Sequence, residues 1–205
     1  MMRVLLLTST LVVSGCISLL PEPPPPPRVF ALEAGAVERL TGAPVDAVIS
    51  VSGPAGERTI LGADMIWRNG DELAYVSQTQ WSNRASDALQ AVLVETLTRQ
   101  GRFRAAVRAG DARSDYEIRW DVLDFEVQEN GMTARFVADV KLVSAPGRRI
   151  IASEIITAEA PVSDRSATIA AQALARAARE GSARIGVFAA DAASVDQANA
   201  ASISR

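Results

Sequence analysis

The segment from residue 116 to residue 160 most constrains what this chain can fold into, because apolar side chains alternate along it in three successive runs. Short turn sequences, Glu129-Asn130-Gly131 and Ala145-Pro146-Gly147-Arg148, separate the runs. Alternation with a period of two is typical of half-buried strands, and Asn-Gly favours a tight turn between antiparallel partners. The pattern therefore predicts an antiparallel meander. In the first run the apolar phase slips at Val122-Leu123, which predicts a β-bulge there.

Shorter apolar segments before residue 110 predict further strands. Asn69-Gly70 separates two of these segments and is typical of a hairpin turn. The expected strands cover residues 29–33, 45–52, 65–68, 73–78 and 103–107.

Two segments repeat apolar residues at intervals of three and four, which predicts amphipathic helices. The first runs from Arg84 to Gln100, with Ser82 as a candidate N-cap and Gly101 as the C-cap. The second begins after Ser163 or Asp164 and ends near Ala190. These elements predict an α+β domain over residues 29–190, with a mostly antiparallel sheet and two main helices packed on one face. The polar stretch 191–205 is expected to be a disordered tail.

Residues 1–16 have the layout of a bacterial lipoprotein signal. Arg3 precedes an apolar run that is too short to span a bilayer as a helix, and Cys16, the only cysteine, follows two small residues. We therefore predict that residues 1–15 are a signal peptide and that Cys16 is the lipid attachment site. The residues expected to be recognised by the lipoprotein signal peptidase are Val13, Ser14 and Gly15.

Residues 16–28 form the expected lipidated cysteine and proline-rich linker. Pro23–Pro27 favour an extended, stiff polyproline II conformation, which suits a spacer between membrane and domain. A docking motif for a proline-binding domain is the alternative interpretation. Ile17 stands where an aspartate would favour retention in the inner membrane. The sequence therefore favours an anchor in the outer membrane, with the domain facing the periplasm.

Composition argues against catalysis. The chain has no histidine, and lipidation would consume its one thiol, so histidine-dependent triads, histidine metal sites and thiol nucleophiles are excluded. The formal net charge is −3, without a basic block that would suit nucleic acid. We expect no enzyme activity, no cofactor, no metal and no nucleic-acid partner.

Three groups of side chains are candidates for a site. Trp67, Tyr75 and Trp81 could contact a partner or a lipid, although core packing is the simpler interpretation; Trp81 stands at a loop-to-helix junction, where an exposed aromatic would suit a partner contact. The carboxylates of residues 117–129 could bind a cation or act as an acid/base pair, but a solvated strand face also explains them. Arginines around residues 99–108 could meet phosphates or simply keep the surface soluble.

Several segments together resemble the ABC-type transport auxiliary lipoproteins. They are Phe30-Ala31-Leu32, Val48-Ile49-Ser50-Val51, Met65-Ile66-Trp67-Arg68, Glu72-Leu73-Ala74-Tyr75, Trp81, the leucine-rich stretch 89–97 and Gly101-Arg102-Phe103. The chain departs from the family pattern at Ser82-Asn83-Arg84, where prolines are usual, and at Val76, where a second aromatic is usual. The resemblance implies a non-enzymatic partner of an ABC transporter and a periplasmic protein with mammalian-cell-entry (MCE) domains. It also implies that several copies can form a homo-oligomeric ring.

Three functions are consistent with these observations. The first is an auxiliary component of an ABC/MCE-type envelope lipid transport system, which docks the periplasmic MCE protein at the outer membrane. The second is a lipid-binding shuttle or acceptor, which needs a large apolar cavity. The third is a periplasmic hydrolase, which needs paired carboxylates buried in a cleft.

Overall fold

The computed structural model describes residues 26–203. The expected signal peptide, the segment Val13–Cys16 and the linker up to Pro25 lie outside the described residues. Within residues 26–203, no helix combines the length and the apolar character that crossing a membrane requires.

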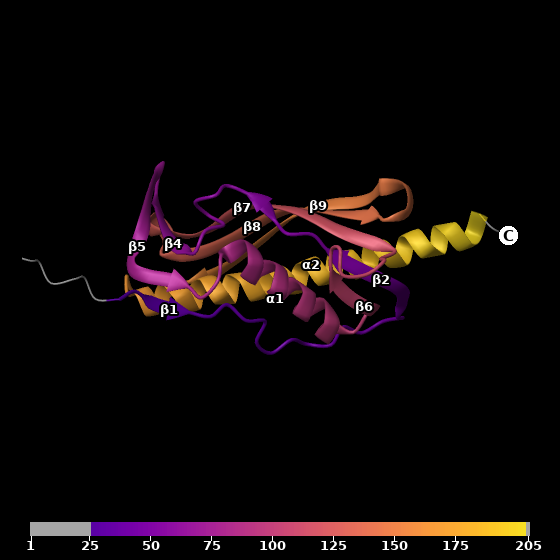
Figure 1. Ribbon diagram of the computed structural model, residues 1–205, viewed down its shortest axis with the longest axis horizontal. Coiled ribbons are helices and arrows are strands. Elements are labelled where there is room, and N and C mark those ends of the chain that lie inside the picture. Colours follow the sequence, from indigo (N-terminus) through magenta and orange to yellow (C-terminus); the bar gives the residue numbers. More distant parts are fainter. Residues whose placement is uncertain (1–25, 204–205) are drawn as a thin grey trace, which may run out of the picture.

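The predicted meander is present and forms the long axis of the sheet (Figure 1). β7 (Tyr116–Gln128), β8 (Thr133–Ser144) and β9 (Arg149–Pro161) pair antiparallel in that order. The 3₁₀ turns Glu129–Gly131 and Pro146–Arg148 connect them. Pairing with β8 passes from Val122 directly to Asp124, so Leu123 is the extra residue of a bulge. This confirms the bulge that the slip in apolar phase predicted.

The other edge of β7 meets three short strands, one after another along its length. β2 (Val45–Val51) pairs near its start, β3 (Ala55–Gly56) near its middle and β4 (Asp64–Asn69) near its end. Three further strands extend the sheet outward: β6 (Phe103–Arg108) beside β2, β5 (Glu72–Trp81) beside β4, and β1 (Arg28–Phe30) beside β5.

The expectation of a mostly antiparallel sheet is wrong, because the nine-stranded sheet is mixed. Only the pairs β4–β5, β7–β8 and β8–β9 are antiparallel, whereas β2, β3 and β4 all run parallel to β7, and β1 and β6 run parallel to their neighbours. Tight turns reveal antiparallel neighbours, but parallel partners are joined by long crossovers that leave no local signal. Val45, for example, pairs with Phe103, although β4, β5 and the first helix all lie between the two residues in the sequence.

Helix α1 (Ala85–Gln100) packs through the predicted stripe of Leu89, Val92 and Leu93, which are buried. Gly101 ends it in the left-handed conformation with φ of 69°. The expected cap at Ser82 is absent among the described contacts: the N-cap is Arg84, without a side-chain hydrogen bond. Carbonyl groups of the loop before β4 accept hydrogen bonds from the first amides instead: Ala85 donates to Gly62 at 2.7 Å and Ser86 donates to Leu61 at 3.3 Å.

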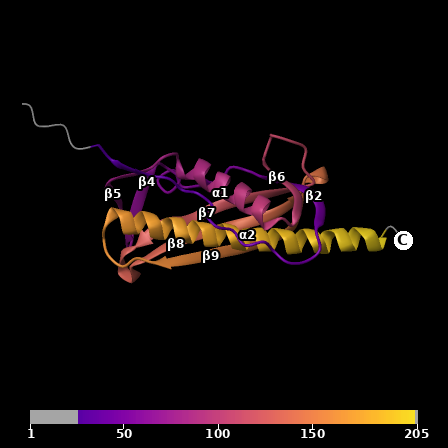
Figure 2. The ribbon, with the colours of Figure 1, turned by 90° about the horizontal axis from the view of Figure 1, so that it is seen from below.

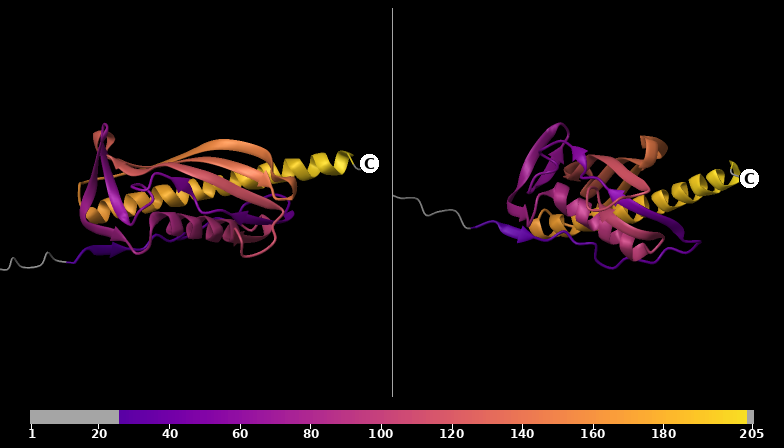
Figure 3. Two further views of the ribbon diagram at one scale, coloured as in Figure 1. Left: turned by 45° about the horizontal axis from the view of Figure 1, so that its top comes forward. Right: turned by 45° about the vertical axis from the view of Figure 1, so that its right-hand side comes forward.

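Helix α2 (Ala167–Ile203) has 37 residues and lies beside α1 on the same face of the sheet (Figure 2). It continues well past Ala190 and projects beyond the strands at its C-terminal end (Figure 3). The expected disordered tail is therefore helical in its described part, up to Ile203. Alanine has the highest helix propensity, and Ala193 is fully buried, so propensity and packing outweigh the polar composition.

Candidate functional site

A groove of about 880 Å³ separates the C-terminal half of α2 from the first half of β9. We call it the α2–β9 groove. Its apolar lining comes from both elements: Ile151, Ile155 and Ile156 on β9, and Val187, Phe188, Ala192 and Val195 on α2. Its charged lining is Arg149, Glu154, Arg184, Asp191 and Asp196.

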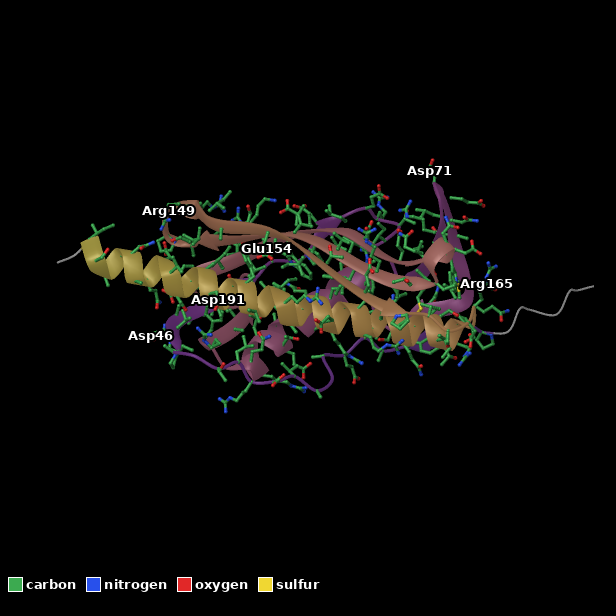
Figure 4. The ribbon with its side chains drawn as sticks, turned by 180° about the vertical axis from the view of Figure 1, so that it is seen from behind. Asp46, Asp71, Arg149, Glu154, Arg165 and Asp191 are labelled. Atoms are coloured by element: carbon green, nitrogen blue, oxygen red, sulfur yellow. The ribbon has the colours of Figure 1, made fainter. Side chains whose placement is uncertain are left out.

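The groove exists because β9 diverges from α2 toward the N-terminal end of the strand. Side chains of residues 156, 158 and 160 point into the core and are at most 4% exposed. Glu154 is on the same face of the strand, since it pairs with Val140, which is fully buried, yet Glu154 itself is exposed. Figure 4 shows Glu154 on β9 and Asp191 on the facing side of α2. The groove is thus the place where the sheet and α2 stop packing against each other.

Large apolar side chains are exposed around the groove. Ile155 is 64% exposed, Val195 60% and Val187 40%, and all three line it. Scattered single apolar residues are ordinary on protein surfaces, but a contiguous apolar patch with a charged rim is typical of an interaction site. The groove therefore has the character of a protein or ligand contact surface.

The charged rim is only partly neutralised. Arg149 donates to Asp196 at 2.8 Å, and Arg184 donates to Glu180 at 2.8 Å. Among residues 26–203, Glu154 has no ion-pair partner, and Asp191 reaches only Arg102 at 4.0 Å while its side chain is 68% exposed. Two carboxylates that face the groove therefore remain nearly uncompensated.

Asp196 closes one end of the groove by joining three elements. It accepts a 3.0 Å hydrogen bond from the phenol of Tyr116 on β7, in addition to the bond from Arg149 on β9. Burial raises the pKa of Tyr116 to about 12, and the hydrogen bond to Asp196 adds to the effect. The last turns of α2 are thereby fastened to the sheet.

A second hollow, of about 770 Å³, lies beside the first between α1, α2 and residues 34–40. Its arginines already hold the backbone in place: Arg179 donates to the carbonyl of Glu33 at 2.7 Å, and Arg176 donates to the carbonyl of Pro161 at 3.0 Å. Because these cations are occupied in fastening loops, this hollow is the weaker candidate.

The three aromatic candidates do not come together at a site. Trp81 is only 4% exposed and stacks on Phe125 with ring centroids 5.9 Å apart, which supports core packing for this residue over the alternative of an exposed partner contact. Trp67 is partly buried against the core, whereas Tyr75 is 63% exposed. Both belong to the β4–β5 hairpin, which lies at the other end of the molecule from the α2–β9 groove (Figure 1).

The carboxylates of β7 also do not form a site. We expected Glu126 to face solvent, but it is fully buried, where it binds Arg68 in an ion pair and accepts a 2.7 Å hydrogen bond from Gln128. Its buried position follows from the β4–β5 hairpin, which no local pattern in β7 reveals. In the described part of the chain, no group of three or more acidic side chains is arranged to hold a metal ion.

The arginines in and after the last turn of α1 are likewise dispersed. Arg99 pairs with Glu95 one turn earlier, and Arg104 pairs with Asp46 at 2.9 Å. Arg102 donates to backbone carbonyls of residues 41 and 43, both at 3.0 Å. These contacts support the structural interpretation of this group.

Sequence analysis missed the α2–β9 groove. One signal was available: Ile150-Ile151 and Ile155-Ile156 place apolar side chains on both faces of a strand, which is unusual for a strand at the edge of a sheet. The residues of α2 that line the groove were hidden because the segment after Ala190 was expected to be disordered.

Comparison with known proteins links the chain to one family. The family model described as an ABC-type transport auxiliary lipoprotein component matches residues 30–186. Among solved structures, the Xanthomonas campestris protein XCC0632, of family DUF330, has a TM-score of 0.77 and 23% identity, over 83% of this chain and 98% of that chain. An uncharacterized protein has a TM-score of 0.63 and 13% identity, over 80% and 98% respectively. No curated protein matches this chain. At these identities the two structures share the fold of this chain.

Proposed function

Because this chain belongs to the family of ABC-type transport auxiliary lipoprotein components, we propose that it docks the periplasmic MCE-domain protein of a lipid transport system at the outer membrane. The family consists of transport components of the cell envelope and is not an enzyme family. In this proposal Cys16 carries the lipid anchor, Pro23–Pro27 hold the domain away from the membrane, and the α2–β9 groove receives the partner.

The α2–β9 groove is the observation that carries the docking role. Its apolar side chains are exposed at the surface and its rim is charged, which suits a protein partner better than an acyl chain. A shuttle for lipids would instead need an enclosed apolar cavity large enough to hold an acyl chain. In the core, aromatic side chains pack against one another instead. The ring centroid of Phe136 lies 6.4 Å from that of Trp120 and 6.4 Å from that of Phe125.

The position of the groove also supports docking. The chain enters the domain at β1, which lies at the opposite end from Arg149 and the end of α2 (Figures 1 and 4). With an anchor before β1, the α2–β9 groove lies at the end of the domain far from the tether. This orientation presents the groove to a component that approaches across the periplasm.

The proposal is tested by crosslinking the intact lipoprotein in its native envelope and purifying it from separated outer membranes. Recovery of an MCE-domain protein, lost when Cys16→Ser releases the chain from the membrane fraction, is the expected result. Recovery of bound phospholipid without any transporter component would instead identify a shuttle. A Cys16→Ser variant that stays in the same membrane fractions would overturn the lipid anchor.

A further inference from the structure

We propose that the α2–β9 groove binds an extended segment of a partner protein, which adds to the free edge of β9 as a further strand and carries a basic side chain between apolar ones. The inference rests on the proposed docking function, because that function requires a partner segment at this surface.

In the described structure, the outer edge of β9 has no hydrogen-bond partner at Ser153 and Ile155, which flank the groove. In the described sheet, β9 pairs with β8 alone, so its outer N–H and C=O groups face away from the sheet. Two outward carbonyls toward the C-terminal end of β9 are covered: Arg184, at the border of the groove, donates to the carbonyl of Thr157 at 2.6 Å, and Arg176 donates to the carbonyl of Pro161. Natural edge strands are usually protected in this way, and the unprotected stretch therefore marks a place for another strand.

The covered carbonyl identifies which backbone groups are free. N–H and C=O groups of one residue point to the same side of an antiparallel strand, and this side alternates along the chain. Because the carbonyl of Thr157 points outward, those of Ile155 and Ser153 do so as well. The register with β8 is continuous from Thr157 to Ser153, so no bulge changes the alternation there.

The groove supplies pockets for the side chains of an added strand. Side chains that point toward α2 would pack on Val187, Phe188 and Val195, all of which line the groove. A strand on β9 therefore buries apolar side chains on one face while its backbone pairs with Ser153 and Ile155. This is the geometry of strand addition, in which backbone bonds supply affinity and side-chain pockets supply specificity.

Charge determines the kind of segment. Arg149 and Arg184 are paired with Asp196 and Glu180, so the groove keeps the charges of Glu154 and Asp191, which stand on its two sides. A lysine or arginine of the partner would lie between these carboxylates, and an acidic segment would be repelled. Uncompensated charge at an interface steers the choice of partner.

The first test uses the intact lipidated chain in detergent and a labelled peptide, Val-Thr-Lys-Thr-Val-Thr, with blocked ends, in which the two valines and the lysine share the face toward α2. Ser153→Pro removes an outward N–H without removing a bond to β8, and should weaken binding roughly tenfold. Glu154→Lys should weaken it by a similar factor, as should glutamate in place of the peptide's lysine. The controls are Glu159→Pro, outside the groove and between the two covered carbonyls of the same edge, and Asp71→Lys, at the far end of the molecule (Figure 4). Equal binding to wild type and Ser153→Pro, or no binding of the lysine peptide, would overturn the proposal.

The second test places a photo-crosslinking amino acid at Ile155 in the native envelope. The expected product joins Ile155 to an extended, basic segment of a transporter component, and Ser153→Pro abolishes it. If the transporter component is captured equally by wild type and Ser153→Pro, the docking function stands and strand addition is wrong. If the lysine peptide binds but no transporter component is captured, the docking function is wrong. A crosslink to a second copy of this chain would overturn the choice of a different protein as partner.

Discussion

The phenol of Tyr116, the first residue of β7, donates a 3.0 Å hydrogen bond to Oδ2 of Asp196, eighty positions later on α2. The second carboxylate oxygen of Asp196 accepts a hydrogen bond from Arg149, the first residue of β9, at 2.8 Å. One carboxylate therefore joins the starts of two strands to the C-terminal part of α2, and its loss should be felt mainly by that part of the helix.

Tyr116→Phe should free the end of α2. The variant removes one hydrogen bond to a charged acceptor, which contributes about 1.5 to 3 kcal/mol when buried and less where water can replace it. We expect faster amide hydrogen exchange over residues 190–203 and little change in α1. Asp191→Asn, on the same helix but outside this contact, is the control and should leave exchange unchanged. Equal exchange in both variants would show that Asp196 does not fasten the helix.

Stability should fall in alkali because of the same phenol. Burial, aided by Asp196, raises the pKa of Tyr116 from its ordinary value of 10.0 to about 12. The native state thus holds the phenolic proton more tightly than the unfolded state, and its contribution is complete below pH 10 and lost as pH rises toward 12. Denaturant midpoints measured across this window should fall more steeply for wild type than for Tyr116→Phe. Parallel curves for the two proteins would contradict the assignment.

Gly181→Ala should destabilise the domain. An added Cβ would lie 2.2 Å from Cδ1 of Phe136, whose ring is fully buried among other rings. Overpacking of this kind typically costs about 1 to 3 kcal/mol, as measured by denaturant unfolding. In a Phe136→Leu background the added methyl group should be tolerated better. A cost for Gly181→Ala that is the same in both backgrounds would show that helix propensity or another contact is responsible.

Gln78→Gly should stabilise the chain slightly. Gln78 has a φ of 50°, inside an irregular stretch where β5 gains residues relative to β4. The left-handed conformation costs an L-residue roughly 1 to 2 kcal/mol, and the added freedom of glycine when unfolded returns about 0.5 to 1 kcal/mol of that. We expect a net gain of about 0.5 kcal/mol in thermal or denaturant unfolding. Ser77→Gly, at the neighbouring exposed residue without positive φ, should instead lose stability.

Removing one partner of the buried ion pair should be severe. Arg68 neutralises Glu126, which is fully buried and whose Oε2 has no hydrogen-bond partner among the described residues. The pKa of Arg68 is raised, mainly by its hydrogen bond to Glu126, so Arg68 stays charged across the neutral range. Arg68→Met leaves an uncompensated carboxylate and should cost about 3 to 5 kcal/mol. Adding Glu126→Gln to that variant should recover part of the loss, and an additive loss would contradict the pairing.

Local patterns predicted the elements that have local causes. The β7–β9 meander, the bulge at Leu123, the first helix and its end at Gly101 all follow from side-chain periodicity and turn residues. The parallel pairing of β2 with β6 and β7 could not be predicted, because the partners are far apart and alternation has the same period in parallel and antiparallel strands. The length of α2 was underestimated because polarity was given more weight than alanine content.

The candidate site was harder to predict than the fold. The sequence around Trp81 would be the same whether the side chain packs on Phe125 or faces a partner. Only the tertiary structure distinguishes these two positions. Glu126 looked like the other carboxylates of its strand until the β4–β5 hairpin placed Arg68 beside it. The α2–β9 groove arises from the divergence of two elements, which is a property of their relative position and of no single segment.

The length of α2 has a mechanical consequence. Its first turn lies beside β1, where Arg28 donates to Thr168 at 2.8 Å, and its last part is held by Asp196 at the other end of the domain. A helix of 37 residues rises about 1.5 Å per residue, so it extends about 55 Å. This single continuous helix keeps a fixed distance between the point where the chain enters the domain and the surface that α2 presents at its far end. That distance does not change when the linker bends.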